Sequence, residues 1–126
     1  YNGKISIIKE FSKIKPINAN EAQLNQVFLG ILLNAIQSIN DQGAIYIRTA
    51  MESNQYVRIE IEDTGAGIPT EILGKVFDPF FTNKPVGEGT GLGLSIAYQF
   101  IDAHKGKISI DSAIEKGTKV TIVLPV

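Results

Sequence analysis

One carboxylate stands where its neighbours predict a buried side chain. Asp63 follows the segment 57–62, in which apolar and polar residues alternate, so position 63 continues the apolar face of a strand. A carboxylate that points inward needs hydrogen-bond donors. Glycines at 65 and 67 would let a ligand approach the backbone closely. A buried acceptor beside open backbone suits the exocyclic amino group of adenine, although Asp-Thr-Gly is also a common turn after a strand.

A second stretch has the composition of an anion site. Segment 87–94 reads Gly-Glu-Gly-Thr-Gly-Leu-Gly-Leu and leads directly into an apolar, helix-like stretch. Free backbone N–H groups at a helix start attract anions, and Thr90 adds a hydroxyl donor. The segment is not a P-loop, because the Gly-Lys-Ser/Thr ending is missing, and its spacing differs from the dinucleotide fingerprint. A phosphate-binding loop and a merely flexible, glycine-rich loop are the two interpretations.

Three further polar residues could serve a ligand or only the surface. Asn34 lies at the edge of the apolar arc of a predicted helix, where its amide oxygen could bind Mg²⁺ or simply face water. Lys84 could neutralise a phosphate or be a solvated lysine. Thr118 could share a polar contact with adenine or only begin a strand after Gly117. The single histidine, His104, is interpreted as a cap near a helix C-terminus.

Segment 77–84, Phe-Asp-Pro-Phe-Phe-Thr-Asn-Lys, places three aromatic residues in a stretch otherwise built as a loop. Aromatic side chains in a loop are costly to leave in water. They tuck under the domain edge, meet a partner, or form a satellite core cluster. The sequence alone leaves these alternatives open.

Hydrophobic periodicity predicts the elements that must position these residues. The expected order is strand, helix, strand, strand, short helix, helix, strand, strand. It predicts one α/β (α+β) domain over 1–126, a two-layer sandwich with a mixed, mostly antiparallel five-stranded sheet and about three helices on one face. The strands are expected at 5–11, 45–51, 57–62, 107–112 and 118–124, and the helices from about 20 to 39, at 69–75 and at 91–103.

Composition excludes several classes of function. The 126 residues include no cysteine, which removes disulfides and thiolate chemistry and fits a reducing compartment. The net charge of -1 gives no global attraction for nucleic acid or anionic lipid. No run of about 18 apolar residues is present, so we expect no direct membrane insertion. The start of the chain does not resemble a signal peptide.

The ordered set of motifs resembles the N, G1, F, G2 and G3 boxes of bacterial sensor histidine kinase catalytic domains, in the GHKL ATPase superfamily. The match covers nearly the whole chain. It rests on Asn34-Ala35, Asp63-x-Gly65-x-Gly67, the segment 77–81, the segment 87–94 and Gly117-Thr118.

The resemblance implies ATP and Mg²⁺ as cofactors and a role for each motif. Asn34 would hold Mg²⁺, Asp63 would accept from adenine, and Thr118 would support the base. Segment 77–84 and the loop up to Gly89 would form a mobile lid, and Gly89 to Gly93 would contact phosphate. The residues expected to contact the nucleotide are Asn34, Asp63, Gly65, Gly67, Ile68, Phe77, Lys84, Gly89, Thr90, Gly91, Leu92, Gly93, Leu94 and Thr118.

Two departures from the family bear on the reaction. The family often has a second asparagine one turn before the metal-binding one, and here that position is Gly30. Members of the gyrase branch carry a glutamate there that activates water, so efficient hydrolysis by that route is not expected. These residues also do not include the helical hairpin with the phosphoacceptor histidine, so no catalytic residue is assigned in this segment.

The expected partners follow from the resemblance. They are ATP or ADP, the helical dimerisation and phosphoacceptor domain of the same protein, and a response regulator receiver domain. This domain is expected to be cytoplasmic and monomeric by itself, whether or not the full-length protein is anchored in a membrane. The alternatives are a catalytically silent nucleotide-binding or docking module and a serine-directed kinase of the anti-sigma type.

Overall fold

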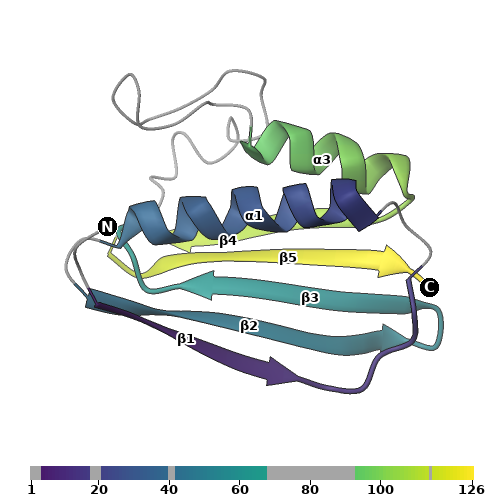
Figure 1. The fold of residues 1–126 in the computed structure, drawn as a ribbon, viewed down its shortest axis with the longest axis horizontal. Helices are drawn as coiled ribbons and strands as arrows, with labels where there is room; N and C mark the ends of the chain where they lie inside the picture. The colour runs from purple at the N-terminus through teal and green to yellow at the C-terminus, as the bar shows by residue number, and fades with distance from the viewer. Residues whose placement is uncertain (1–3, 18–20, 40–41, 68–92, 114) are drawn as a thin grey trace.

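The computed structural model describes residues 4–17, 21–39, 42–67, 93–113 and 115–126. Within these ranges the chain forms a five-stranded sheet with two helices on one side (Figure 1). The predicted short helix at 69–75 and the lid lie outside the described residues. The elements are β1 Lys4–Phe11, α1 Glu21–Ser38, β2 Gln42–Ser53, β3 Tyr56–Asp63, α3 Gly93–Ala103, β4 Lys107–Ala113 and β5 Gly117–Pro125.

The sheet is mixed and mostly antiparallel, as predicted. Its strand order is β1-β2-β3-β5-β4, in which β1 and β2 run parallel and the other three neighbouring pairs run antiparallel. The expected hairpin is confirmed as the β2–β3 pair. Insertion of β5 between β3 and β4 is the topological step that matters for the site, because it brings the start of β5 beside the end of β3.

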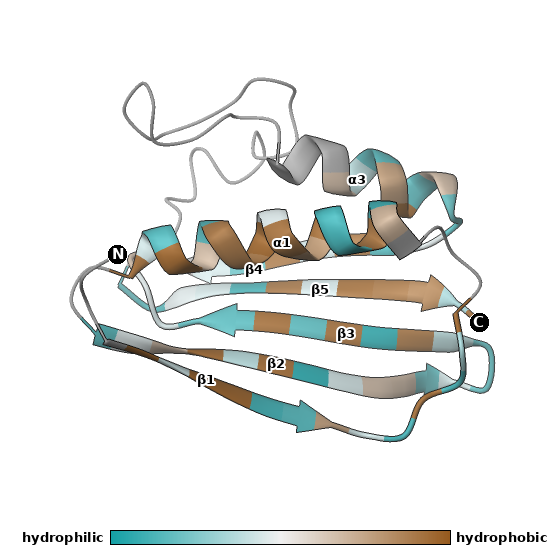
Figure 2. Ribbon diagram, in the orientation of Figure 1, coloured by the Kyte–Doolittle hydropathy of each residue, from teal (hydrophilic) through white to brown (hydrophobic). Residues whose placement is uncertain are grey.

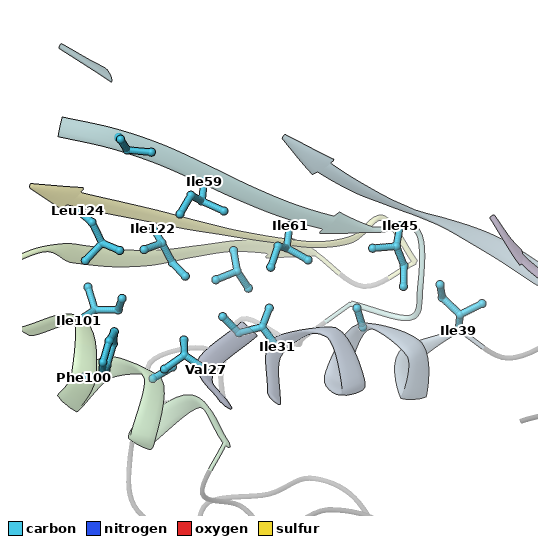
Figure 3. Packing of buried hydrophobic residues seen from close by; sticks show 14 residues of the cluster. Val27, Ile31, Ile39, Ile45, Ile59, Ile61, Phe100, Ile101, Ile122 and Leu124 are labelled. Atoms are coloured by element: carbon cyan, nitrogen blue, oxygen red, sulfur yellow. The ribbon is translucent and has the colours of Figure 1, made fainter. Parts of the chain in front are cut away.

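Helix α1 covers the sheet through one apolar stripe. Val27, Ile31 and Ala35 of α1, and Ile39 directly after its end, recur every four residues and are all buried. They pack against strand residues and against α3, whose Phe100 and Ile101 enter the same core (Figure 3). Hydropathy follows this arrangement, since apolar residues gather on α1 and on the strands beneath it (Figure 2). Burial of this stripe fixes the height and rotation of α1 over the sheet.

Helix α3 ends in a turn that includes the single histidine. The Nδ1 atom of His104 lies 2.9 Å from the carbonyl oxygen of Phe100, and it must donate because a carbonyl only accepts. The two rings are 4.1 Å apart. These contacts support the interpretation of His104 as a cap. Within the described residues, neither helix is long and apolar enough to cross a membrane.

Candidate functional site

The alternation of β3 carries Asp63 into the protein interior. Every second residue of β3 is buried, and the pattern continues through the last residue, so Asp63 is only 5% exposed. Its side chain therefore lies on the helix-facing side of the sheet, with Val57, Ile59 and Ile61. The predicted inward-pointing carboxylate is confirmed. Among the described residues it is the single buried polar or charged side chain.

Donors from two parts of the fold meet the Asp63 carboxylate. The Ser38 hydroxyl at the end of α1 lies 3.1 Å from Oδ1, and the backbone N–H of Gly65 donates to the same oxygen over 2.8 Å. Thr118, at the start of β5, lies directly beside Asp63 as its partner in the sheet. The bonds from Ser38 and Gly65 hold the side chain in one orientation. They also satisfy the hydrogen-bonding need of a buried carboxylate.

The loop 64–67 is tied to its surroundings at three points. Thr64 extends the β2–β3 ladder, since its N–H donates to the Ala44 carbonyl and its Oγ1 accepts from the Ala44 N–H. The N–H of Ala66 donates to the Ser38 carbonyl at the end of α1 over 3.0 Å, and the Ala66 carbonyl accepts from Glu115 over 2.7 Å. The backbone around Asp63 is therefore fixed before any ligand arrives, which lowers the entropic cost of binding.

Two glycines allow this close packing. A Cβ on Gly65 would collide with the hydroxyl and backbone of Ser38. A Cβ on Gly117 would collide with the Asp63 carbonyl oxygen, and Gly117 also has a φ of +86°. At both places the backbone comes nearer to its neighbour than any other residue type permits. These contacts bring α1, the 64–67 loop and the β4–β5 turn together around one carboxylate.

Burial raises the pKa of Asp63 above its ordinary value of 3.8, because the low-dielectric interior disfavours the charged form. The hydrogen bonds from Gly65 and Ser38, together with the nearby backbone N–H of Thr118, lower the pKa but do not cancel the desolvation, and the neighbouring Glu62 charge raises it further. The native fold therefore holds a carboxylate whose charge is only partly compensated by its own donors. Such a group has an electrostatic reason to accept another hydrogen bond from a ligand.

This raised pKa predicts a particular pH dependence of stability. The native state binds a proton on Asp63 more tightly than the unfolded state does, so stability falls as pH rises from about 3.8 through the native pKa. In the Asp63→Asn variant, position 63 has no group that titrates in this pH range. We expect the unfolding free energy of the parent, relative to Asp63→Asn, to decrease across this window in urea titrations without nucleotide. A difference that stayed constant or increased with pH would contradict the raised pKa.

Asn34 lies on the flank of α1 that carries Ser38. It is half-buried, and it stands one helical turn before Ser38, so the two residues share one side of the helix. That placement agrees with the predicted position at the edge of the apolar arc. Within the described residues, no group of three histidine, cysteine or acidic side chains forms a metal site. An amide at this flank can still supply one oxygen to a cation whose other ligands come from phosphate and water.

Some of the residues predicted to contact the nucleotide lie close together in the structure, and others lie outside the described residues. Asp63, Gly65 and Thr118 meet at one point, Gly67 follows with a φ of 80°, and Gly93 begins α3, which also includes Leu94. Predictions for the remainder of the nucleotide set lie outside the described residues. They concern Ile68, Phe77, Lys84, Gly89, Thr90, Gly91 and Leu92.

Sequence reasoning missed three hydroxyl residues of the site. Ser38 could have been found from its four-residue spacing after Asn34, which puts both on one helix flank. Thr64 stands inside the recognised Asp-Thr-Gly stretch, but its bond to Ala44 depends on the β2–β3 register. Ser112 contacts Thr118 across the β4–β5 pair, and no local signal marks it.

Comparison with known proteins agrees with the geometry. Residues 19–126 match the family described as histidine kinase-, DNA gyrase B- and HSP90-like ATPase. The chain is 42% identical to the signal transduction histidine-protein kinase AtoS of Escherichia coli K12, over 98% of this chain and 20% of that protein. It is 39% identical to sporulation kinase A of Bacillus subtilis, over 86% of this chain and 18% of that protein. The chain thus spans about a fifth of these relatives.

Solved structures of similar shape are also histidine kinases. The mycobacterial sensor histidine kinase MprB matches with a TM-score of 0.85 and 29% identity, over 96% of this chain and 81% of that chain. The catalytic domain of histidine kinase ThkA matches with a TM-score of 0.82 and 32% identity, over 96% and 80%. With the buried carboxylate, the glycines and the sheet order in place, this chain belongs to the histidine kinase-, DNA gyrase B- and HSP90-like ATPase family, as a catalytic domain of the sensor histidine kinase type.

Proposed function

We propose that this domain binds Mg–ATP and donates the γ-phosphoryl group to a histidine on a separate helical dimerisation domain of the same protein. The phosphoryl group would then pass to an aspartate of a response regulator. The observation that carries the proposal is the buried, hydrogen-bonded Asp63 carboxylate at the meeting point of α1, β3 and β5. Membership of an ATPase family and similarity to sensor kinases support the same assignment.

Base recognition rests on Asp63. Its carboxylate is held by donors and is still only partly compensated, so an exocyclic amino group is the natural further donor. Gly65 and Gly67 would let the base lie against the backbone, Ile68 would add an apolar contact, and Thr118 would support the base from β5. A base with a carbonyl at the same position would face an acceptor instead, which predicts preference for adenine.

Phosphate binding is assigned to the segment that leads into α3. Gly89, Thr90, Gly91 and Gly93 would offer backbone N–H groups and one hydroxyl to the phosphates, with Lys84 as a countercharge. Leu92 and Leu94 would flank this turn, and Phe77 would belong to the lid over the nucleotide. When bound, Mg²⁺ neutralises phosphate charge and orients the γ-phosphoryl group, and Asn34 would provide its protein oxygen.

The nucleophile is assigned to the partner domain. Phosphoryl transfer depends mainly on alignment and charge neutralisation, so this domain alone supplies ATP and its orientation but no acceptor. Gly30 occupies the place where a water-activating carboxylate would stand in the gyrase branch. Transfer to a protein side chain, rather than hydrolysis, is therefore the proposed reaction.

Transfer can be tested by mixing this domain with a separately purified acceptor domain. We expect labelled phosphate from ATP to appear on a separately purified helical dimerisation domain of the same protein, and to be lost in acid because phosphohistidine is acid-labile. The same acceptor with its histidine replaced by alanine is the control. Acid-stable label would indicate a serine-directed kinase. ATP binding without any transfer would indicate a silent nucleotide-binding module.

A further inference from the structure

A row of polar side chains crosses three strands at the Asp63 end of the sheet. Asp63 on β3 pairs with Thr118 on β5, and Thr118 pairs in turn with Ser112 on β4. Paired residues of neighbouring strands project to the same face, which here is the helix-facing side that holds Asp63. Thr118 and Ser112 are both half-buried. Ser112 is therefore one strand further from the carboxylate than Thr118.

Hydrogen counting fixes the direction of the bonds in this row. Ser112 Oγ lies 3.0 Å from the Gly117 carbonyl oxygen and 2.8 Å from Thr118 Oγ1. A carbonyl oxygen can only accept, and a serine hydroxyl has one hydrogen. Both bonds coexist only when Ser112 donates to Gly117 and Thr118 donates to Ser112. The Thr118 hydroxyl hydrogen is then engaged, and toward a ligand Thr118 Oγ1 can act only as an acceptor.

We propose that Ser112 is a positioning residue that determines base specificity by holding the Thr118 hydroxyl as an acceptor. This inference rests on the proposed function, in which Asp63 and Thr118 meet the base of ATP. With Thr118 held this way, both side chains present acceptors to the base edge. An amino group of adenine satisfies them, whereas the carbonyl of a 6-oxo purine places a third acceptor beside two others.

Removal of the Ser112 hydroxyl releases the Thr118 hydrogen. Thr118 can then rotate and donate to a 6-oxo group, so the site tolerates inosine triphosphate better while Asp63 still favours adenine. We expect the ratio of the Kd for inosine triphosphate to the Kd for ATP to fall roughly five- to tenfold in Ser112→Ala, measured by calorimetry. Ser112→Thr keeps a hydroxyl on a strand position and should retain the parental ratio.

Two further variants separate this role from a structural one. Ser109→Ala changes an exposed serine on the same strand and should leave the ratio unchanged. Thr118→Val keeps the shape of threonine without its hydroxyl, so it should lower the ratio by itself and abolish the effect of Ser112→Ala. If Ser112→Ala does not fold, the Kd ratio of Thr118→Val still tests whether the Thr118 hydroxyl acts as an acceptor toward the base.

The outcomes distinguish this inference from the function on which it rests. An unchanged ratio in Ser112→Ala, with ATP binding intact, would overturn the role of Ser112 and leave ATP binding standing. The same holds if Thr118→Val leaves the ratio unchanged, or if the parent shows no preference for ATP. A folded parent that binds neither nucleotide would instead contradict the proposed function.

Discussion

Asp63→Asn is expected to weaken ATP binding about 100-fold. Asparagine keeps the volume of aspartate, and its oxygen can still accept from Ser38 and Gly65. The other oxygen, however, becomes an NH₂ group, which cannot accept a hydrogen bond from the amino group of adenine. Two donors, the new NH₂ group and the adenine amino group, would then face each other in a buried site. The charge that strengthens the bond in the parent is lost as well. Calorimetric titration with ATP, with and without Mg²⁺, measures the change directly.

Asp111→Asn is the matched control for this measurement. Asp111 is exposed on β4 and faces Lys119 on β5, so its substitution removes the same charge without touching the site. We expect its ATP affinity to remain within about twofold of the parent, because an exposed charge contributes little. Equal effects of the two substitutions would mean that net charge, rather than the buried carboxylate, governs binding. A folded Asp63→Asn variant with parental affinity would remove the adenine assignment altogether.

Gly117→Ala is expected to destabilise the fold by about 2–4 kcal/mol. Two costs add at this position. The φ of +86° is a left-handed conformation that alanine adopts only with strain, and the new Cβ would collide with the carbonyl oxygen of Asp63. That oxygen belongs to backbone paired in the sheet, so it cannot yield as a flexible side chain would. Urea unfolding of the parent and the variant measures the difference.

The neighbouring Lys116→Ala substitution tests whether the loss of stability is specific to position 117. Lys116 is exposed in the same turn, so we expect a change of less than about 0.5 kcal/mol. Gly117→Ala should also weaken ATP binding, since relief of the collision displaces Asp63 or its strand partner Thr118. A variant with parental stability and affinity would show that the turn can move away from β3 without consequence.

Secondary structure could be read from the chain because its signals are local. The four-residue recurrence that ends in Ala35 and Ile39 predicts α1, and the alternation through Ile59 and Ile61 predicts β3. The same alternation placed Asp63 on the buried face, since side-chain direction in a strand depends only on residue parity. The assignments for segment 68–92, from its glycine pattern and from motif resemblance, lie outside the described residues and stay predictions.

The partners of Asp63 could not be derived in the same way. Ser38 is 25 residues away in sequence, and its hydroxyl reaches Asp63 only because α1 docks at one height over the sheet. The sequence predicted Thr118 as a contact of the base, but its position beside Asp63 requires β5 to lie between β3 and β4. Strand order and helix docking are set by the packing of the whole core, and no local pattern encodes them.

The sequence by itself determined the periodicities of the elements, the burial of Asp63 and the ordered glycine motifs that mark the family. Only the tertiary structure decided which donors surround the carboxylate, how closely Gly117 approaches it, and that Ser112 stands behind Thr118. The physical reason is that periodicity acts over a few residues through backbone geometry. Hydrogen-bond direction and backbone contact depend on register across strands that are distant along the chain.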